Sequence, residues 1–208
     1  MVIGDRDVHA LDACVTELNR AGQISGYPLD VTDAESFAVF LDKARGDGGG
    51  RIDVLINNAG IDDDTPFLEV DRERWLDVVA TNLTGPFLMA QAVARTMVPA
   101  GGGVILHNAS IDASGGDGPF VAYNASKAGL LGLNRTMALE LGPLGIRSNC
   151  VSPGFTHTLM TESAVGPALM GYLNGKFDRV PLRRLVKPTE IAAAFAVLLY
   201  LRSGSPLS

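Results

Sequence analysis

Short apolar runs alternate along the chain with longer stretches in which apolar residues recur at helical spacing. Residues 52–56 are apolar at nearly every position, as the buried strands of a parallel sheet are. Between residues 8 and 18, in contrast, apolar residues recur every three or four positions, and Gly22 then ends the predicted helix. This alternation of strands and helices is typical of βα units around a parallel sheet.

The same pattern predicts the order of elements along the chain. Strands are expected at residues 1–4, 24–29, 52–56, 104–106 and 146–151. Helices are expected at residues 8–21, 33–44, 71–98 and 120–141, with a last helix that opens at residue 188. We expect the helix 71–98 to break or bend around Gly85-Pro86. The chain is therefore predicted to form one α/β domain over residues 1–208, a Rossmann-like doubly wound parallel sheet in three layers.

Composition and charge narrow the class of partner. The formal net charge is −6, and the Lys and Arg residues are scattered, which argues against a nucleic acid or a membrane surface as partner. The longest apolar run, residues 191–201, is shorter than the ~20 residues that cross a bilayer. Cys14 and Cys150 lie far apart without metal-type spacing. We therefore expect no metal site and a reducing, cytoplasmic location.

Candidate chemistry lies in the loops after the predicted strands, because ligands of such sheets bind beyond the carboxyl ends of the strands. Tyr123 and Lys127 are four residues apart in a predicted helix and share one face. A neighbouring ammonium favours the phenolate, so this pair is a candidate general acid and base. Ser110 follows the strand that precedes this helix, where its hydroxyl can hold a carbonyl or alcohol oxygen.

Further residues at the ends of the predicted strands complete an ordered set with this pair: Asp5, Asp30-Val31, Asn57-Asn58-Ala59-Gly60, Asn82, Ser110, Tyr123-x-x-x-Lys127 and Pro153-Gly154. This ordered set, which extends over essentially the whole chain, resembles the short-chain dehydrogenases/reductases. The resemblance implies an oxidoreductase that interconverts a secondary alcohol and a ketone by hydride transfer, with NAD or NADP as cofactor.

The resemblance also implies a catalytic role for four of these positions. Tyr123 would donate or accept the proton, and Ser110 would orient the substrate oxygen. Lys127 would lower the pKa of Tyr123 and hold the nicotinamide ribose. Asn82 would complete the set by holding a water that links Lys127 to solvent.

The remaining matching positions would bind the cofactor. Asp5 would bind the hydroxyls of the adenine ribose, and because its charge repels a 2′-phosphate, NAD is preferred to NADP. The adjacent Arg6 keeps NADP as the alternative. The other positions are Asp30 and Val31 at the adenine, Asn57, Ala59 and Gly60 on the floor of the site, and Pro153, Gly154, Thr156 and Thr158 at the nicotinamide.

The chain departs from the family at both ends. The first strand with its glycine-rich turn, which lets the backbone approach the pyrophosphate, and the last strand have no counterpart. We therefore expect an N- and C-terminally truncated fold, in which the strands at 1–4 and 52–56 lack their common neighbour. Unpaired edges would make the chain unstable or prone to associate. The alternative to an active enzyme is a truncated, non-catalytic fragment or scaffold that cannot bind the cofactor by itself.

Three further expectations concern the substrate, the assembly and the class of reaction. Residues 155–187 would form a substrate lid, whose small and apolar side chains favour an apolar or mixed small molecule: Ala164, Val165, Ala168, Leu169 and Met170. Helix 120–141 is apolar almost all round and matches the family's usual oligomer surface, so we expect a homodimer or homotetramer. A serine hydrolase is disfavoured, because no serine lies in a G-x-S-x-G turn.

Overall fold

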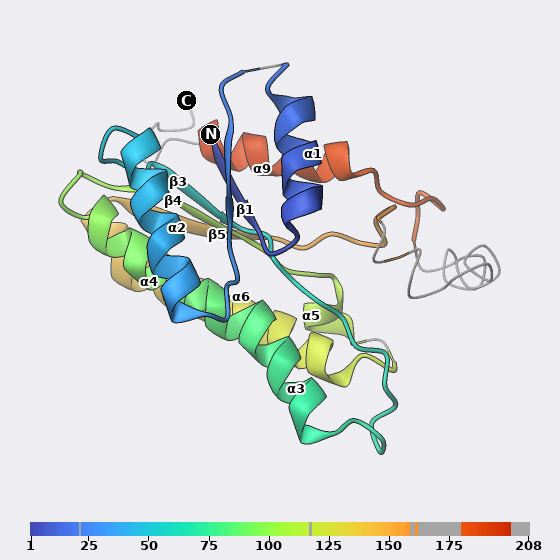
Figure 1. Cartoon of the computed structure of the whole chain (residues 1–208). Coiled ribbons are helices and arrows are strands. Elements are labelled where there is room, and N and C mark those ends of the chain that lie inside the picture. Colours follow the sequence, from blue (N-terminus) through green and yellow to red (C-terminus); the bar gives the residue numbers. More distant parts are fainter. Residues whose placement is uncertain (21, 117, 159–160, 162–179, 201–208) are drawn as a thin grey trace.

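The structure is a computed structural model that describes residues 1–20, 22–116, 118–158, 161 and 180–200 (Figure 1). Its strands are β1 (Val2–Asp5), β2 (Ser25–Pro28), β3 (Val54–Asn57), β4 (Gly103–Asn108) and β5 (Ile146–Val151). All pairings are parallel, which confirms the predicted fold class. β5 coincides with the predicted strand, whereas β3 begins two residues later than expected.

The strands form two sheets. One has the order β1-β2 and the other the order β3-β4-β5, and no described strand joins β1 to β3. This gap lies where the sequence predicts the loss of a common neighbour. Two apolar side chains of β3 are consequently part-exposed, since Val54 keeps 39% and Ile56 keeps 42% of its surface accessible.

Helices cover both faces of the strands. In Figure 1, α2, α4 and α6 lie along one side of the strands, and α1 and α9 lie along the opposite side. The described helices are α1 (Val8–Leu18), α2 (Ala34–Asp47), α3 (Arg72–Val79), α4 (Gly85–Met97), α5 (Asp112–Gly115), α6 (Val121–Leu141) and α9 (Pro188–Tyr200), with a π-helical turn at Ala80–Thr84 and a 3-10 turn at Gly142–Leu144. Asp7, Asp33 and Asp71 cap α1, α2 and α3 by accepting backbone N–H bonds.

The long central helix is interrupted close to the predicted position. A π-helical turn at Ala80–Thr84, which ends directly before Gly85-Pro86, joins α3 to α4. Gly85 also permits close packing, because an added Cβ would lie 2.8 Å from the carbonyl oxygen of Val31. The glycine therefore lets the loop after β2 pack directly on the start of α4. The short helix α5 was not predicted.

One hydrophobic core joins the two sheets on the side of α2, α4 and α6. Its centre is formed by Met97, Ile105 and Ile146, which are fully buried. Val2 from β1 and Leu55 from β3 pack against the same cluster, so both sheets rest on shared helices. Each fully buried side chain of this kind contributes about 1.5–3 kcal/mol, which holds the sheets together without a hydrogen-bonded ladder between β1 and β3.

Candidate active site

The loops after β4 and β5 are held side by side at the carboxyl end of the larger sheet. Ala109 donates its N–H to the carbonyl of Val151 at 2.8 Å, and Ile111 donates to the carbonyl of Pro153 at 3.0 Å. These bonds extend the parallel ladder beyond the strands. Ser110, which lies between the two donors, is thereby fixed in a buried position with 6% of its surface exposed.

α6 brings Tyr123 and Lys127 to the same place. Lys127 is 4% exposed, and its Nζ donates a hydrogen bond of 2.7 Å to the carbonyl oxygen of Asn108 at the end of β4. The same Nζ lies 5.4 Å from the centre of the Tyr123 ring. Burial lowers the pKa of Lys127 from 10.5 to about 8, because the charged form loses its hydration.

The pKa of Tyr123 corrects one expectation from the sequence. Burial raises the pKa of Tyr123 above its ordinary value, a hydrogen bond with Ser110 lowers it, and the charges of Asp112 and Asp62 raise it further. The pKa of Tyr123 lies above its ordinary value, so the predicted lowering by Lys127 is wrong. The physical reason is that the ammonium lies over the ring and is hydrogen-bonded to the Asn108 carbonyl.

Asn82 lies in the π-helical turn and is fully buried. Its Nδ2 donates to the carbonyl of Ile61 at 2.8 Å and to Oγ of Ser126 at 3.1 Å, while its Oδ1 accepts the N–H of Ile61 at 2.9 Å. Ser126 in turn donates to the carbonyl of Tyr123 at 2.7 Å. Asn82 thus ties the loop after β3 to the first turns of α6. Its role in holding a water for Lys127 stays a prediction.

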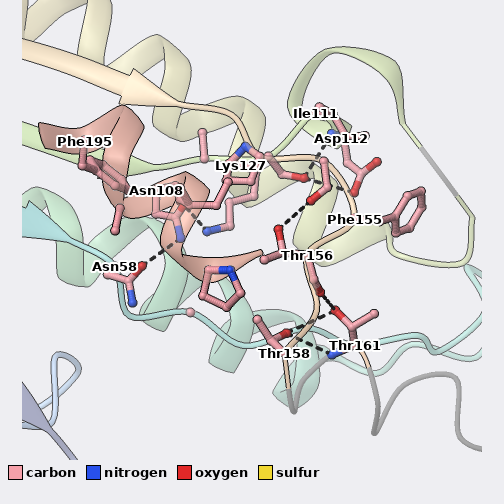
Figure 2. A pocket seen from close by; sticks show the side chains of 18 of the residues that line it. Asn58, Asn108, Ile111, Asp112, Lys127, Phe155, Thr156, Thr158, Thr161 and Phe195 are labelled. Atoms are coloured by element: carbon pink, nitrogen blue, oxygen red, sulfur yellow. Dashed lines mark hydrogen bonds between the residues drawn. The ribbon is translucent and has the colours of Figure 1, made fainter. Parts of the chain in front are cut away.

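A cavity of about 560 Å³ collects many of the predicted residues (Figure 2). It is lined by eight of them: Gly60, Ser110, Tyr123, Lys127, Pro153, Gly154, Thr156 and Thr158. Phe195 and Leu199 of α9 line it as well and supply an apolar wall. Because Gly60 has no side chain, the loop comes close to the catalytic candidates, and an added Cβ would lie 3.5 Å from Nζ of Lys127.

The loop after β5 is ordered by its threonines (Figure 2). The Thr156 hydroxyl donates to the carbonyl of Gly154 at 2.9 Å, and the Thr161 hydroxyl donates to the carbonyl of Thr156 at 2.7 Å. Thr158 Oγ1 accepts the N–H of Thr161 at 3.3 Å. These hydroxyls are therefore engaged with the loop's own backbone.

Five predicted cofactor residues lie outside the lining of this cavity: Asp5, Asp30, Val31, Asn57 and Ala59. Asp5 Oδ1 accepts the N–H of Asp7 at 2.9 Å in the turn that precedes α1. Asp30 Oδ1 accepts both the N–H and the hydroxyl of Thr32, at 2.8 and 2.7 Å, and these bonds hold the pKa of Asp30 below its usual value. Both carboxylates therefore stabilise local turns, and their roles at an adenosine stay predictions.

Asn57, which does not line the cavity, has hydrogen-bond partners within the protein. Its Nδ2 donates to the carbonyl of Pro86 at 3.2 Å and lies 3.3 Å from Nδ1 of His107. His107 is fully buried, and burial lowers its pKa from 6.5 to about 4. The imidazole is therefore neutral in this position.

Two carboxylates at the cavity were missed by the sequence reasoning. Asp112 is hydrogen-bonded to Ser110, and Asp62 lines the cavity from the loop after β3. Burial raises the pKa of Asp62, with smaller contributions from Asp64 and Asp63. The position of Asp112 two residues after Ser110 was the available signal, because a short polar side chain at that spacing often bonds to its neighbours.

The described residues hold neither a candidate metal site nor a candidate membrane span. Among these residues, no set of three His, Cys, Asp or Glu side chains could hold a metal ion. No helix among them is long and apolar enough to cross a membrane. The predicted lid reaches from 155 to 187, but its apolar members lie outside the described residues: Ala164, Val165, Ala168, Leu169 and Met170.

The parallel sheets with flanking helices place this protein in the class of Rossmann-like folds. A family model described as enoyl-(acyl carrier protein) reductase matches residues 1–204. The chain belongs to the short-chain dehydrogenase/reductase family, whose members carry out NAD(P)-dependent oxidoreduction.

Relatives of this chain carry different activities. It is 37% identical over 204 residues to 3-oxoacyl-[acyl-carrier-protein] reductase FabG of Thermotoga maritima, covering 98% of this chain and 80% of that protein. It is 39% identical over 181 residues to D-threitol dehydrogenase of Mycolicibacterium smegmatis, covering 85% of this chain and 66% of that protein. A solved structure described as a short-chain alcohol dehydrogenase of Sinorhizobium meliloti 1021 superposes with a TM-score of 0.85 at 33% identity, covering 95% of this chain and 77% of that one.

The described residues fit the nicotinamide half of a nicotinamide dinucleotide, that is, its ribose and the reacting end. Lys127 presents a buried ammonium next to Gly60, and Ser110 and Tyr123 line the same cavity. Such a donor set suits a ribose hydroxyl and a reacting oxygen. For the pyrophosphate, the described ranges hold no glycine-rich turn between a strand and a helix.

Proposed function

We propose that this protein interconverts a secondary alcohol and a ketone with a nicotinamide cofactor, and that Tyr123 moves the proton. The observation that carries the proposal is the convergence of Ser110, Tyr123 and Lys127 from two elements on one cavity. Each of these residues is buried or part-buried, so solvent does not compete for the reacting oxygen.

The reaction uses few groups of the protein. In oxidation, the Tyr123 phenolate accepts the hydroxyl proton of the alcohol, while the carbinol hydrogen leaves with its electron pair and the C–O bond becomes a carbonyl. A bound nicotinamide would supply the acceptor for this hydride. The Lys127 ammonium would hold a ribose hydroxyl, and Ser110 would fix the substrate oxygen. Asn82 acts at a distance by fixing the loop after β3 against α6.

NAD is proposed as the preferred cofactor. Asp5 is exposed at the end of β1, and its carboxylate would accept from a 2′-hydroxyl but repel a 2′-phosphate. A thermal-shift titration with NAD and with NADP measures the preference, because a ligand that binds only the folded chain raises its apparent stability. A larger shift with NADP would contradict the preference for NAD.

A second candidate substrate is a 3-oxoacyl thioester. It is favoured by the 37% identity to a 3-oxoacyl-[acyl-carrier-protein] reductase over 98% of this chain. This substrate is also a ketone, so the same three residues would serve it. Reduction of a 3-oxoacyl thioester, compared with oxidation of threitol and of a simple secondary alcohol, separates the candidates.

The test of the catalytic role is the variant Tyr123→Phe, with Tyr200→Phe as matched control. Tyr200 is 84% exposed at the end of α9 and does not line the cavity. We expect Y123F to lose about 10²-fold or more in turnover, because general acid–base catalysis contributes at least that much, and to keep its thermal shift with the cofactor. Near-normal turnover of Y123F would refute the assignment. No shift of the wild type with either cofactor would favour the non-catalytic scaffold.

A homodimer or homotetramer is proposed through the outer faces of α4 and α6. Phe87 and Leu88 on α4 are 41% and 40% exposed, and Leu139 on α6 is 79% exposed. Large apolar side chains left exposed on helix faces are found at interfaces between subunits. Size-exclusion chromatography with light scattering tests the assembly, and a monomer at all concentrations would contradict it. A location in the cytoplasm stays a prediction.

A further inference from the structure

Asp62 places a carboxylate on the wall of the candidate active-site cavity. It lines the cavity from the loop after β3, two residues beyond Gly60. Asp62 is half-buried, and its charge contributes to the raised pKa of Tyr123, so the carboxylate lies close enough to the phenol to act on it electrostatically. A carboxylate that has lost part of its hydration requires a hydrogen-bond donor in place of the lost water.

The loop holds the backbone of Asp62 in place from both sides. The preceding residue, Ile61, is bonded to Asn82 through both of its backbone groups, its N–H at 2.9 Å and its carbonyl at 2.8 Å. The following residue, Asp63, is buried, and its Oδ1 accepts the N–H and the hydroxyl of Thr65 at 3.2 and 2.6 Å. Asp62 is therefore positioned before a substrate binds, which reduces the entropy lost on binding.

The Asp62 carboxylate is available to a ligand. Among the residues that the structure describes, it is hydrogen-bonded to its own backbone N–H and to no other group. The Ser110 hydroxyl, in contrast, is bonded to Asp112 and to Tyr123. An ionised carboxylate accepts hydrogen bonds and donates none. Asp62 therefore presents acceptor oxygens to any donor that the substrate carries.

The charges of the cavity decide which kind of donor fits. An ammonium group would lose its hydration in the cavity and would share it with the Lys127 ammonium, which Figure 2 shows among the lining side chains. A neutral hydroxyl has neither cost and makes a charge-assisted bond with a carboxylate, about twice as strong as a bond between neutral groups. The carbonyl of a thioester only accepts, so it would leave Asp62 unpaired. A second hydroxyl is thus the best complement to Asp62.

We propose that Asp62 is a specificity-determining residue that accepts a hydrogen bond from a second hydroxyl of the substrate, so that the preferred substrate is a neutral polyol. This inference rests on the proposed function, because it assigns the reacting hydroxyl to Tyr123. In the oxidation, the reacting hydroxyl gives its hydrogen to Tyr123 and the second hydroxyl directs its own to Asp62, so no hydrogen is used twice. Asp62 lies outside the set of site residues that the family resemblance implies.

Two substitutions remove the carboxylate in different ways. Asp62→Ala deletes it, whereas Asp62→Asn keeps its shape, removes its charge and adds a donor. Asp64→Asn is the matched control, because Asp64 is an exposed carboxylate of the same loop that does not line the cavity. Since the Asp62 carboxylate is bonded to no other described residue, all three variants should unfold close to the wild-type temperature.

Steady-state kinetics compare alcohols that differ by one hydroxyl: butane-2,3-diol with butan-2-ol, and pentane-2,4-diol with pentan-2-ol. In the wild type and D64N, kcat/KM for at least one diol should exceed that of its matched monoalcohol by about tenfold or more, the value of a hydrogen bond to a charged group. D62A should lose this preference, and D62N should keep only part of it. The ratio cancels the effect of the Asp62 charge on Tyr123, which both alcohols share.

Three kinetic results would overturn the proposal. The first is a wild type that prefers neither diol, and the second is a D62A variant that keeps the preference. The third is a better substrate of another class: 3-aminobutan-2-ol oxidised with a higher kcat/KM than either diol, or a 3-oxobutanoyl thioester reduced with a higher kcat/KM than the hydroxyketone formed from the better diol.

A second measurement does not depend on turnover. Dissociation constants of each diol and its matched monoalcohol are measured by NMR titration of the wild type and D62A with NAD present. The inference predicts that the wild type binds one diol about tenfold more tightly than its monoalcohol and that D62A binds the two equally. If the wild type oxidises no alcohol with either cofactor, the proposed function fails, while this ratio still decides the role of Asp62. Oxidation of monoalcohols with equal binding of both alcohols would leave the proposed function intact and overturn the inference.

Discussion

Replacing Lys127 by methionine should stabilise the fold while it abolishes the proposed activity. Lys127 is buried at 4% exposure, and its Nζ donates a hydrogen bond of 2.7 Å to the carbonyl of Asn108. Methionine fills a similar volume and carries no charge, so it removes the cost of burying an ammonium. Such a gain in stability is expected where a charged group is kept for function.

The magnitude follows from the pKa of Lys127. Its fall from 10.5 to about 8 corresponds to about 3 kcal/mol of destabilisation when both the folded and the unfolded chain carry the proton. The variant leaves the Asn108 carbonyl without its donor, which costs about 1 kcal/mol. We expect Lys127→Met to raise the free energy of unfolding by about 2 kcal/mol at neutral pH.

The pH dependence has a definite sign. Below a pH of about 8 the wild type carries the full penalty, because Lys127 is charged in both states. As the pH rises from about 8 to 10.5, the folded chain releases its proton before the unfolded chain does, so the wild type gains stability. The advantage of K127M should therefore shrink over this range.

Urea unfolding of both proteins at about pH 7 and about pH 10 measures the difference. Lys43→Met is a control at a lysine of α2 that lies over the Tyr27 ring, outside the cavity. The reasoning would be refuted if K127M were less stable than the wild type at neutral pH, or if its advantage did not change with pH.

Two further variants test the supports of the site. Asn82→Ala removes three hydrogen bonds from a fully buried residue and leaves the N–H and carbonyl of Ile61 without these partners, so urea unfolding should show a loss of about 2–4 kcal/mol. A loss below about 1 kcal/mol would mean that the tie is unimportant. Gly102→Ala places a Cβ against the carbonyl of Gly145 at a φ of +119°, so thermal unfolding should show a loss of about 2 kcal/mol or more, and no loss would contradict the turn geometry.

The sequence predicts those parts of the site whose positions follow from the spacing of residues within one helix or from the order of strands and loops. Tyr123 and Lys127 share a helix face because they are four residues apart, and Ser110 joins them because parallel strands end at one edge of the sheet. Neither inference requires knowledge of a distant contact. The family membership was predicted from the resemblance of the ordered motif set, and the parallel α/β fold from the alternation of short apolar runs with amphipathic stretches; both are confirmed.

The parts that were missed depend on tertiary contacts. The π-helical turn at Ala80–Thr84 presents Asn82 to Ile61, a partner 21 residues earlier, and no local pattern indicates it. The raised pKa of Tyr123 comes first from the depth of burial, which helical spacing to Lys127 does not report. Asp5 is bonded within its own turn because short acidic side chains before a helix favour that contact.

The central claim is that Tyr123 and its neighbours carry out hydride transfer between an alcohol and a nicotinamide. Its most direct test is to incubate the chain with NAD and a panel of secondary alcohols deuterated at the carbinol carbon, and to measure deuterium in the reduced cofactor. The account predicts transfer from at least one alcohol by the wild type and by Y200F, and a loss of about 10²-fold or more in Y123F. No transfer by the wild type, or equal transfer by Y123F, would contradict it.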